Sequence, residues 1–105
     1  MIKYSLTIGK NDKDLKKQIL NDESIESLIT SALHHNSIEC FTMLDCAGFY
    51  TYENGQNVKE RSVRIEVCTN ENIDSNIKNT IELLKTSLNQ ECIMVEKEKK
   101  DISFL

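Results

Sequence analysis

Asn54 and Gly55 stand between two long runs of strand-forming residues, and this arrangement constrains the fold more than any other feature of the chain. The two runs cover residues 38–52 and 57–69. A two-residue type I′ turn needs two consecutive residues with positive φ, which Asn and Gly tolerate at little cost. The sequence therefore predicts a long β-hairpin from Ile38 to Thr69.

A two-residue turn also sets which residues lie opposite each other across the hairpin. Counting outward from the turn pairs Tyr50 with Lys59, and Asp45 with Arg64. One face then suits a core, with Thr42, Leu44 and Cys46 opposite Val67, Ile65 and Val63. The other face alternates charges with three large apolar side chains, Phe41, Met43 and Phe49. We predict that these three form an interface with a subunit or a ligand; a partly solvated sheet face is the alternative.

The remaining elements follow from hydrophobic spacing. Residues 2–9 alternate apolar and polar side chains, which predicts a half-buried strand. Residues 12–35 show helical spacing that is interrupted at 21–23, so we expect one kinked helix or two helices, with Asp22 or Ser24 as a cap. A second helix is predicted over 73–88 with Asn72 as its N-cap. The C-terminal part reads as a strand at 92–96, a charged turn at 97–101 and a short strand at 102–105.

The order strand–helix–strand–strand–helix–strand is the signature of an α+β, ferredoxin-like sandwich. It has an antiparallel sheet with a long central hairpin and two helices on one face. A chain of 105 residues is expected to form a single domain over residues 1–105. Because helices cover only one face of such a sheet, the other face remains open to a partner.

Composition excludes several classes of function. The net charge of −4 argues against a nucleic-acid binder, and the three glycines form no phosphate-binding loop. The four cysteines, which form no C-x-x-C pair, are expected to be buried thiols in a reducing compartment rather than zinc ligands. Neither a membrane-spanning run nor a signal peptide is recognisable, so we expect no membrane partner and a cytoplasmic location.

Two cations and two phenols meet at the outer part of the predicted hairpin. They are Lys59, Arg61, Tyr50 and Tyr52. A guanidinium binds phosphate bidentately and a phenol ring offers a π-face, so this group predicts a ligand site for a small anion with a stackable base, such as a nucleotide. A solvated hairpin tip is the alternative. Arg64 and Asp45 either extend the ligand site or form a cross-strand ion pair.

No residues suggest catalysis or metal binding. The neighbours His34 and His35 point in different directions on a helix, and their position at its C-terminal end favours a capping role. The Ser and Thr residues have no motif context, and no His is placed beside a Cys or a carboxylate. The sequence therefore predicts no catalytic residue, no metal site and no cofactor.

Three motifs carry a resemblance to a known family. They are the stretch 41–50, which reads FTMLDCAGFY, the triplet Glu60-Arg61-Ser62, and Gln90-Glu91-Cys92 ahead of a closing Ser103-Phe104. They resemble a bacterial family of unassigned function with the pattern T-x-L-D-A-x-G-x-W, G, E-x-S and Q-E-S-V near S-F; Tyr50 falls near its tryptophan. The architecture also resembles PII-like signalling proteins, which implies ligand binding in clefts between subunits near the base of the hairpin loop.

These observations lead to one main hypothesis and two alternatives. The main hypothesis is a non-enzymatic homo-oligomer, a dimer or trimer, that holds a small anionic molecule at a subunit interface. A composition rich in Asn, Lys and Ile suits a phage-encoded sequestering or anti-defence protein. The first alternative is a protein-interaction module that docks through its open sheet face. The second is a small enzyme that uses Asp45 or a His as its acid–base group.

Overall fold

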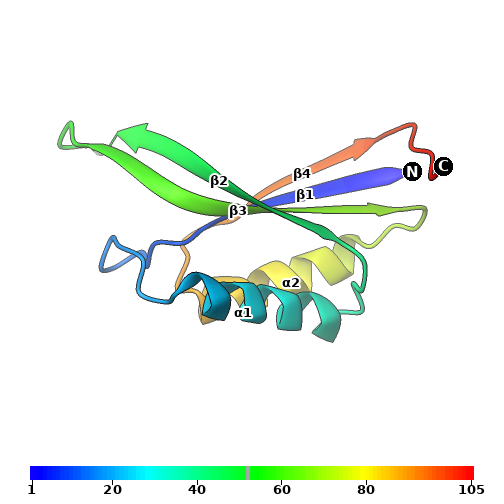
Figure 1. The fold of residues 1–105 in the computed structure, drawn as a ribbon, viewed down its shortest axis with the longest axis horizontal. Coiled ribbons are helices and arrows are strands. Elements are labelled where there is room, and N and C mark those ends of the chain that lie inside the picture. The colour runs from blue at the N-terminus through cyan, green and yellow to red at the C-terminus, as the bar shows by residue number, and fades with distance from the viewer. Residues whose placement is uncertain (52) are drawn as a thin grey trace.

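A four-stranded sheet and two helices make up the protein, for which the computed structural model describes residues 1–51 and 53–105 (Figure 1). The elements are β1 (Ile2–Gly9), α1 (Asp22–His35), β2 (Thr42–Thr51), β3 (Asn57–Thr69), α2 (Asp74–Ser87) and β4 (Met94–Lys99). The strands are antiparallel in the order β2-β3-β1-β4, and both helices lie on one side of the sheet. The predicted α+β, ferredoxin-like fold is confirmed.

The hydrophobic core lies between the sheet and the helices. Strands β1 and β3 contribute alternate residues, and each helix contributes one apolar stripe. The most deeply buried members are Tyr4, Leu6, Ile8, Ile25, Ile29, Leu33, Ile65 and Leu84. Burying one such side chain stabilises the fold by about 1.5–3 kcal/mol, so this layer holds the helices on the sheet.

Helix α1 begins at Asp22, later than the helical spacing predicted. Its N-cap is Asn21, whose side-chain oxygen accepts a hydrogen bond from the Ser24 N–H at 2.8 Å. Upstream, the Asp12 carboxylate accepts from the backbone N–H of Leu15 at 3.0 Å, and Lys16 has a φ of 57°. These local turns compete with a helix, so the helix predicted over 12–20 is wrong.

Helix α2 and β4 lie close to their predicted positions. Helix α2 begins at Asp74 and its N-cap is Ile73 rather than the predicted Asn72, whose side chain accepts from the Asp74 N–H at 2.9 Å. The Tyr4 hydroxyl donates to Asp74 at 2.6 Å, which ties the start of the helix to the sheet. Strand β4 pairs with β1 as far as Lys99, so the turn predicted from residue 97 is wrong, and residues 102–105 form no strand.

The hairpin pairs one residue out of step with the prediction. Phe49 lies opposite Lys59, and Leu44 lies opposite Arg64. Gly55 has a φ of 86°, but Asn54, which the structure describes, does not have a positive φ, so the type I′ turn is not formed and residues 52–56 connect the strands. Tyr52 lies outside the described residues.

The shift exchanges the two faces of β2, because side chains alternate along a strand. Phe41 and Met43 pack against the core on the helix side, and the Phe41 ring lies 5.8 Å from that of His34 in the last turn of α1. Leu44 is instead 43% exposed on the open face. The predicted core face of β2 was therefore wrong, and none of Phe41, Met43 and Phe49 is on the open face of the sheet.

All four cysteines, Cys40, Cys46, Cys68 and Cys92, are exposed free thiols, so the prediction that they are buried was wrong. The register shift places Cys46 on the open face, where alternation along β3 also puts Cys68. In the described part of the chain, no group of side chains could hold a metal ion, and no helix has the length and apolar character to cross a membrane.

Candidate functional site

A hollow of about 300 Å³ opens where β1 ends, between the hairpin and the segment that leads into β4. Its volume is at the lower end of the range for small-molecule sites. Three stretches of chain meet there: residues 11–16 after β1, the strands β2 and β3, and residues 90–92. The lining residues are Asn11, Asp12, Lys13, Lys16, Tyr50, Glu60, Gln90, Glu91 and Cys92.

Glu60 and Tyr50 reach the hollow from the open side of the sheet. Val63 and Ile65 of β3 point into the core, so Glu60 points to the opposite face. Gly48 lies opposite Glu60, and Tyr50 is two residues further along β2 on that same face. A half-buried carboxylate and a phenol ring therefore share this wall of the hollow.

The Glu60 carboxylate is held by the backbone rather than by a cation. The Asn11 N–H donates to its Oε2 at 3.0 Å. A Cβ added at Gly9 would lie only 2.5 Å from its Oε1, so the carboxylate occupies space that the glycine leaves open. Among the described residues, no Lys or Arg forms an ion pair with Glu60. Its negative charge is available to a positively charged ligand.

The loop that carries Asn11 is anchored to the end of α2. The Gln90 side chain is 9% exposed, and its amide donates to the Asn11 carbonyl. The Asn89 amide donates to Asp12 and to Asp14, each at 2.9 Å. The hydrogen bonds from the Leu15 N–H and from Asn89 lower the pKa of Asp12, so this carboxylate stays ionised.

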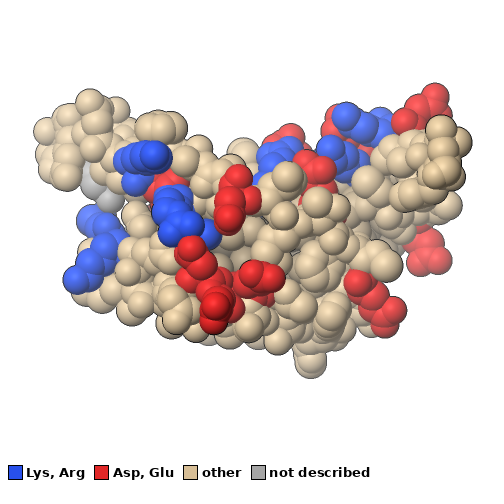
Figure 2. Space-filling view, viewed as in Figure 1, with Lys and Arg blue, Asp and Glu red and all other residues tan. Residues whose placement is uncertain are grey.

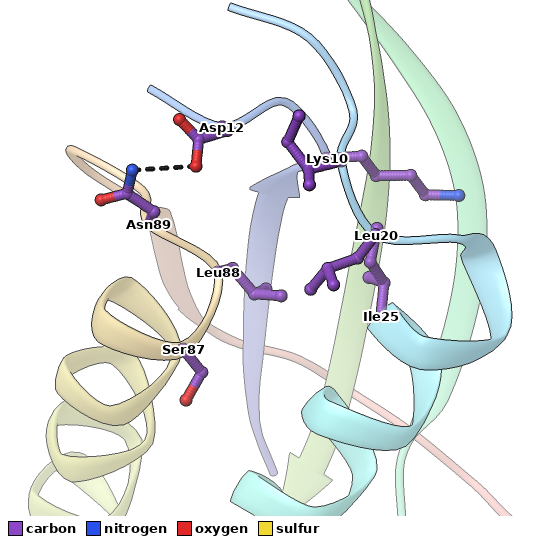
Figure 3. A pocket seen from close by; sticks show the side chains of 8 residues that line it. Lys10, Asp12, Leu20, Ile25, Ser87, Leu88 and Asn89 are labelled. Carbon is purple, nitrogen blue, oxygen red and sulfur yellow. Dashed lines mark hydrogen bonds between the residues drawn. The ribbon is translucent and has the colours of Figure 1, made fainter. Parts of the chain in front are cut away.

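A second hollow, of about 200 Å³, lies between the start of α1 and the end of α2 (Figure 3). Its walls are mainly aliphatic, with Leu20, Ile25 and Leu88 side by side, and the Lys10 ammonium points away from Leu88. Because this hollow is smaller and its Lys10 ammonium points away, it is a weaker candidate for a polar ligand.

On the helix side of the sheet, four charged side chains near the start of α1 are paired with one another. The Lys10 ammonium is buried and lies 3.3 Å from both Asp22 and Asp45, and Arg61 lies 2.8 Å from Asp22. Hydrogen bonds from Gln18, Arg61 and Lys10 hold the pKa of Asp22 well below its usual range. Basic and acidic side chains are interspersed on the face seen in Figure 2. This cluster suits a structural role.

The residues predicted to bind a ligand do not form one group. Lys59 lies over the Phe49 ring at 5.9 Å, and Arg61 points to the helix side. Arg64 pairs with Glu96 at 3.1 Å and with Glu66 at 3.3 Å, which helps to raise the pKa of Arg64; the predicted pair between Asp45 and Arg64 is therefore wrong. Phe49 is 75% exposed. Of the described residues in this prediction, only Tyr50 lines the hollow.

Sequence reasoning missed three residues of this candidate site, Asn11, Glu60 and Gln90. Asn11 and Gln90 are joined across 79 positions of sequence, so no local pattern connects them. The available signal was the motif resemblance, which contains both Glu60 and Gln90.

The chain resembles known proteins both in sequence and in fold. The model of the S-adenosylmethionine lyase family matches residues 9–105. None of the curated proteins matches the chain. A phage S-adenosylmethionine lyase in complex with S-methyl-5′-thioadenosine has a similar structure, with 19% identity and a TM-score of 0.70 over 93% of this chain and 80% of that one. CutA of Pyrococcus horikoshii gives 19% identity and a TM-score of 0.62, over 98% of this chain and 88% of CutA.

The GlnK–ATP complex of B. subtilis also shares the fold, with 11% identity and a TM-score of 0.51 over 93% of this chain and 84% of GlnK. The predicted PII-like architecture is thereby confirmed as a fold. The family match overturns the prediction of a non-enzymatic binding protein, and it favours the alternative of a small enzyme. With residues 9–105 matched by its model, the chain belongs to the S-adenosylmethionine lyase family.

Proposed function

We propose that this protein cleaves S-adenosylmethionine and releases S-methyl-5′-thioadenosine from the hollow that contains Tyr50 and Glu60. The observation that carries this proposal is the Glu60 carboxylate, which is half-buried and held by a backbone N–H, in a chain whose family match spans residues 9–105. A carboxylate with no cation partner among the described residues beside an aromatic ring suits a ligand that combines positive charge with a flat base.

The charge of the hollow supports a cationic ligand. S-adenosylmethionine carries a sulfonium, an ammonium and one carboxylate, so its net charge is positive. The lining contains three carboxylates, Asp12, Glu60 and Glu91, and two lysines, Lys13 and Lys16. Arg61 and Arg64, which were expected to bind an anion, are already paired with carboxylates. A cationic small molecule therefore replaces the predicted anion in this proposal.

The chemistry needs no nucleophile from the protein. S-methyl-5′-thioadenosine keeps the methyl group and the 5′-carbon, so the bond that breaks joins the sulfur to Cγ of the methionine part. The substrate's own carboxylate can attack Cγ and close a lactone, while the bonding electron pair returns to sulfur as a neutral thioether. No water enters and no proton moves. This is consistent with the lack of a nucleophile–base–acid set in the sequence.

The protein's task is then to fold the substrate and to exclude water. Glu60 is placed to bind the ammonium, whose charge does not change during the reaction, and so to bring the carboxylate behind Cγ. The Tyr50 ring offers a face to the adenine. The attack neutralises a carboxylate and a sulfonium, and such a step is faster in a dry site than in water.

A second copy of the chain would close the hollow. Leu44, Tyr50 and Met94 are 43%, 40% and 53% exposed on the open face of the sheet, and β2 and β4 form its two edges. A homo-oligomer, predicted as a dimer or trimer, would cover these apolar groups and shield the site from water.

The likeness to a phage enzyme supports the predicted phage origin, and the cytoplasmic location stays a prediction.

The test incubates the purified protein with S-adenosylmethionine in H₂¹⁸O and follows the products by mass spectrometry. We expect S-methyl-5′-thioadenosine and a lactone without ¹⁸O, whereas attack of water at Cγ would place ¹⁸O on the γ-hydroxyl. Glu60→Gln should reduce kcat/KM by about 10–100-fold, the loss expected for a hydrogen-bonded charge. Glu66→Gln is the matched control, because Glu66 lies on the same strand and face but outside the hollow, where it pairs with Lys3 and Arg64. A wild-type protein that forms no S-methyl-5′-thioadenosine would refute the proposal.

A further inference from the structure

We infer that Gln90 is a positioning residue, which sets the place of the Glu60 carboxylate through the backbone of Asn11 and thereby favours S-adenosylmethionine over S-methyl-5′-thioadenosine. This inference rests on the proposed function. Gln90 does not touch Glu60; it acts on the residue that does.

The chain of contacts runs from the end of α2 to β3. The Gln90 amide, buried with 9% of the residue exposed, donates to the Asn11 carbonyl, and the Asn11 N–H donates to Glu60 at 3.0 Å. The two polar groups of one backbone residue are thus both engaged, which restricts φ and ψ of Asn11. A movement of the Asn11 backbone itself moves the donor on which Glu60 depends.

Gly9 limits the carboxylate from a second side. All three atoms of the Glu60 carboxyl group would lie 2.5–2.6 Å from a Cβ at Gly9. The carboxylate therefore rests against the backbone of β1 while the Asn11 N–H holds it. An alanine at position 9 would displace the flexible end of Glu60 rather than the backbone, so the fold should tolerate the change.

The position of Glu60 matters because only one of the two ligands carries an ammonium. S-adenosylmethionine has this group and the product S-methyl-5′-thioadenosine has lost it. A displaced Glu60 weakens the contact to the substrate and misaligns its carboxylate with Cγ, and a misplacement of about 1 Å can cost about 10²-fold in rate. Binding of the product through its thioadenosine part should not change.

The experiment compares Gln90→Leu with the wild-type protein by steady-state kinetics and by calorimetric titration with S-methyl-5′-thioadenosine. Leucine keeps the approximate volume of the buried side chain and removes its donor. We expect kcat/KM for S-adenosylmethionine to fall by about tenfold, as for one lost hydrogen bond in a charged network, with no change in the Kd for S-methyl-5′-thioadenosine. Gly9→Ala should give the same pattern with an unchanged urea midpoint.

Two controls separate positioning from general loosening of the loop. Asn89→Gly removes the amide that holds Asp12 and Asp14, suits the φ of 48° at this residue, and leaves Asn11 untouched. Its ratio of kcat/KM to product affinity should match the wild-type ratio. In a Glu60→Gln background, Gln90→Leu should have no further effect on this ratio, because its target is gone.

The outcomes distinguish this inference from the proposed function. A wild-type protein that forms no product refutes the proposed function. A Glu60→Gln variant with a reduced ratio, beside a Gln90→Leu variant with the wild-type ratio, refutes the inference alone, as does equal loss of substrate and product binding in Gln90→Leu. Where Gln90→Leu does not fold, Gly9→Ala decides the outcome: an unchanged ratio overturns the role of the Glu60 position.

Discussion

Glu60 and Arg61 are neighbours on β3, yet their side chains lie in opposite kinds of surroundings. Arg61 points to the helix side and joins a cluster in which Lys10, Asp22 and Asp45 neutralise one another. Glu60 points to the open side, where a single backbone N–H holds its carboxylate. Both strand faces are charged here, but Arg61 is paired with a carboxylate, whereas Glu60 has no cation partner among the described residues.

The same alternation continues at the end of β1. Residues there contact both Glu60 on the open side and the aspartates on the helix side. Gly9 leaves space for Glu60, Lys10 turns to the aspartates below the sheet, and the backbone of Asn11 returns to Glu60. Under the proposed function, consecutive residues therefore serve stability and binding in turn. Stability and substrate recognition should respond separately to substitutions on the two faces.

The largest expected effect on stability is that of Lys10→Ala. The Lys10 side chain is 3% exposed, so the change removes a buried aliphatic stem together with the cation shared by two aspartates. We expect the free energy of unfolding, measured in urea, to fall by about 2–3 kcal/mol, as for other large-to-small changes in a core. The rate of S-methyl-5′-thioadenosine formation per folded molecule should stay at the wild-type value.

Glu60→Gln should have the opposite effect to Lys10→Ala, with activity lost and stability kept. It should leave the urea midpoint within the range typical of surface changes, about 0.5 kcal/mol, while reducing product formation. A Lys10→Ala protein that remained as stable as the wild type, or a Glu60→Gln protein that unfolded readily, would show that the two faces do not divide these roles.

A smaller effect is expected at the pair of aromatic neighbours on β2. Tyr50 lies on the open face beside Glu60, whereas Phe49 lies on the other face under Lys59. Tyr50→Ala should weaken binding of S-methyl-5′-thioadenosine by about tenfold, since stacking of a base on an aromatic ring contributes about 1–3 kcal/mol. Calorimetric titration measures this change. Tyr50→Phe keeps the ring and should retain most of the affinity.

Phe49→Ala is the matched control, because it removes an aromatic ring one position away on the opposite face. Product affinity in this variant should equal the wild-type value. Equal losses in Tyr50→Ala and Phe49→Ala would contradict the assignment of the binding site to the open face.

The faces of β3 were predictable from the sequence, whereas those of β2 were not. Val63, Ile65 and Val67 mark the core side of β3 by their own alternation, and this prediction is confirmed. The faces of β2 depended on the turn, and a turn without a positive φ at Asn54 moves every pairing by one residue. Asp45 thereby comes to Lys10 instead of Arg64.

The candidate site was less predictable than the fold for a related reason. Its hollow forms where segments distant in sequence meet, and the contact between Gln90 and Asn11 leaves no periodic trace in the chain. Catalysis is usually recognised in a sequence by a nucleophile and a base, and the proposed attack by the substrate's own carboxylate needs neither. The motifs around Glu60 and Gln90 were the one signal of the site, and they name no chemistry by themselves.

Lowering the pH should destabilise the helix-side charge cluster, because Asp22 then becomes protonated. Its pKa is lowered in the folded protein from the ordinary value of 3.8, so the unfolded chain binds a proton first as the pH falls. The contribution of Asp22 to stability is therefore complete above about pH 5, and it is lost as the pH falls below about 4. Urea midpoints of Asp22→Asn should fall less between pH 6 and pH 3 than those of the wild type. Parallel curves would contradict this role.

Asp45→Asn should have the smallest effect, although Asp45 and Asp22 lie at the same distance of 3.3 Å from the Lys10 ammonium. The Asp45 side chain is 82% exposed against 48% for Asp22, and Arg61 contacts only Asp22. Solvent screens an exposed pair, so the loss of stability in urea should be about 0.5 kcal/mol or less. Because Asp45 points to the helix side, product formation should not change. A loss of activity in Asp45→Asn would instead show that this carboxylate contributes to the site. It would contradict the assignment of stability to the helix side and of binding to the open side.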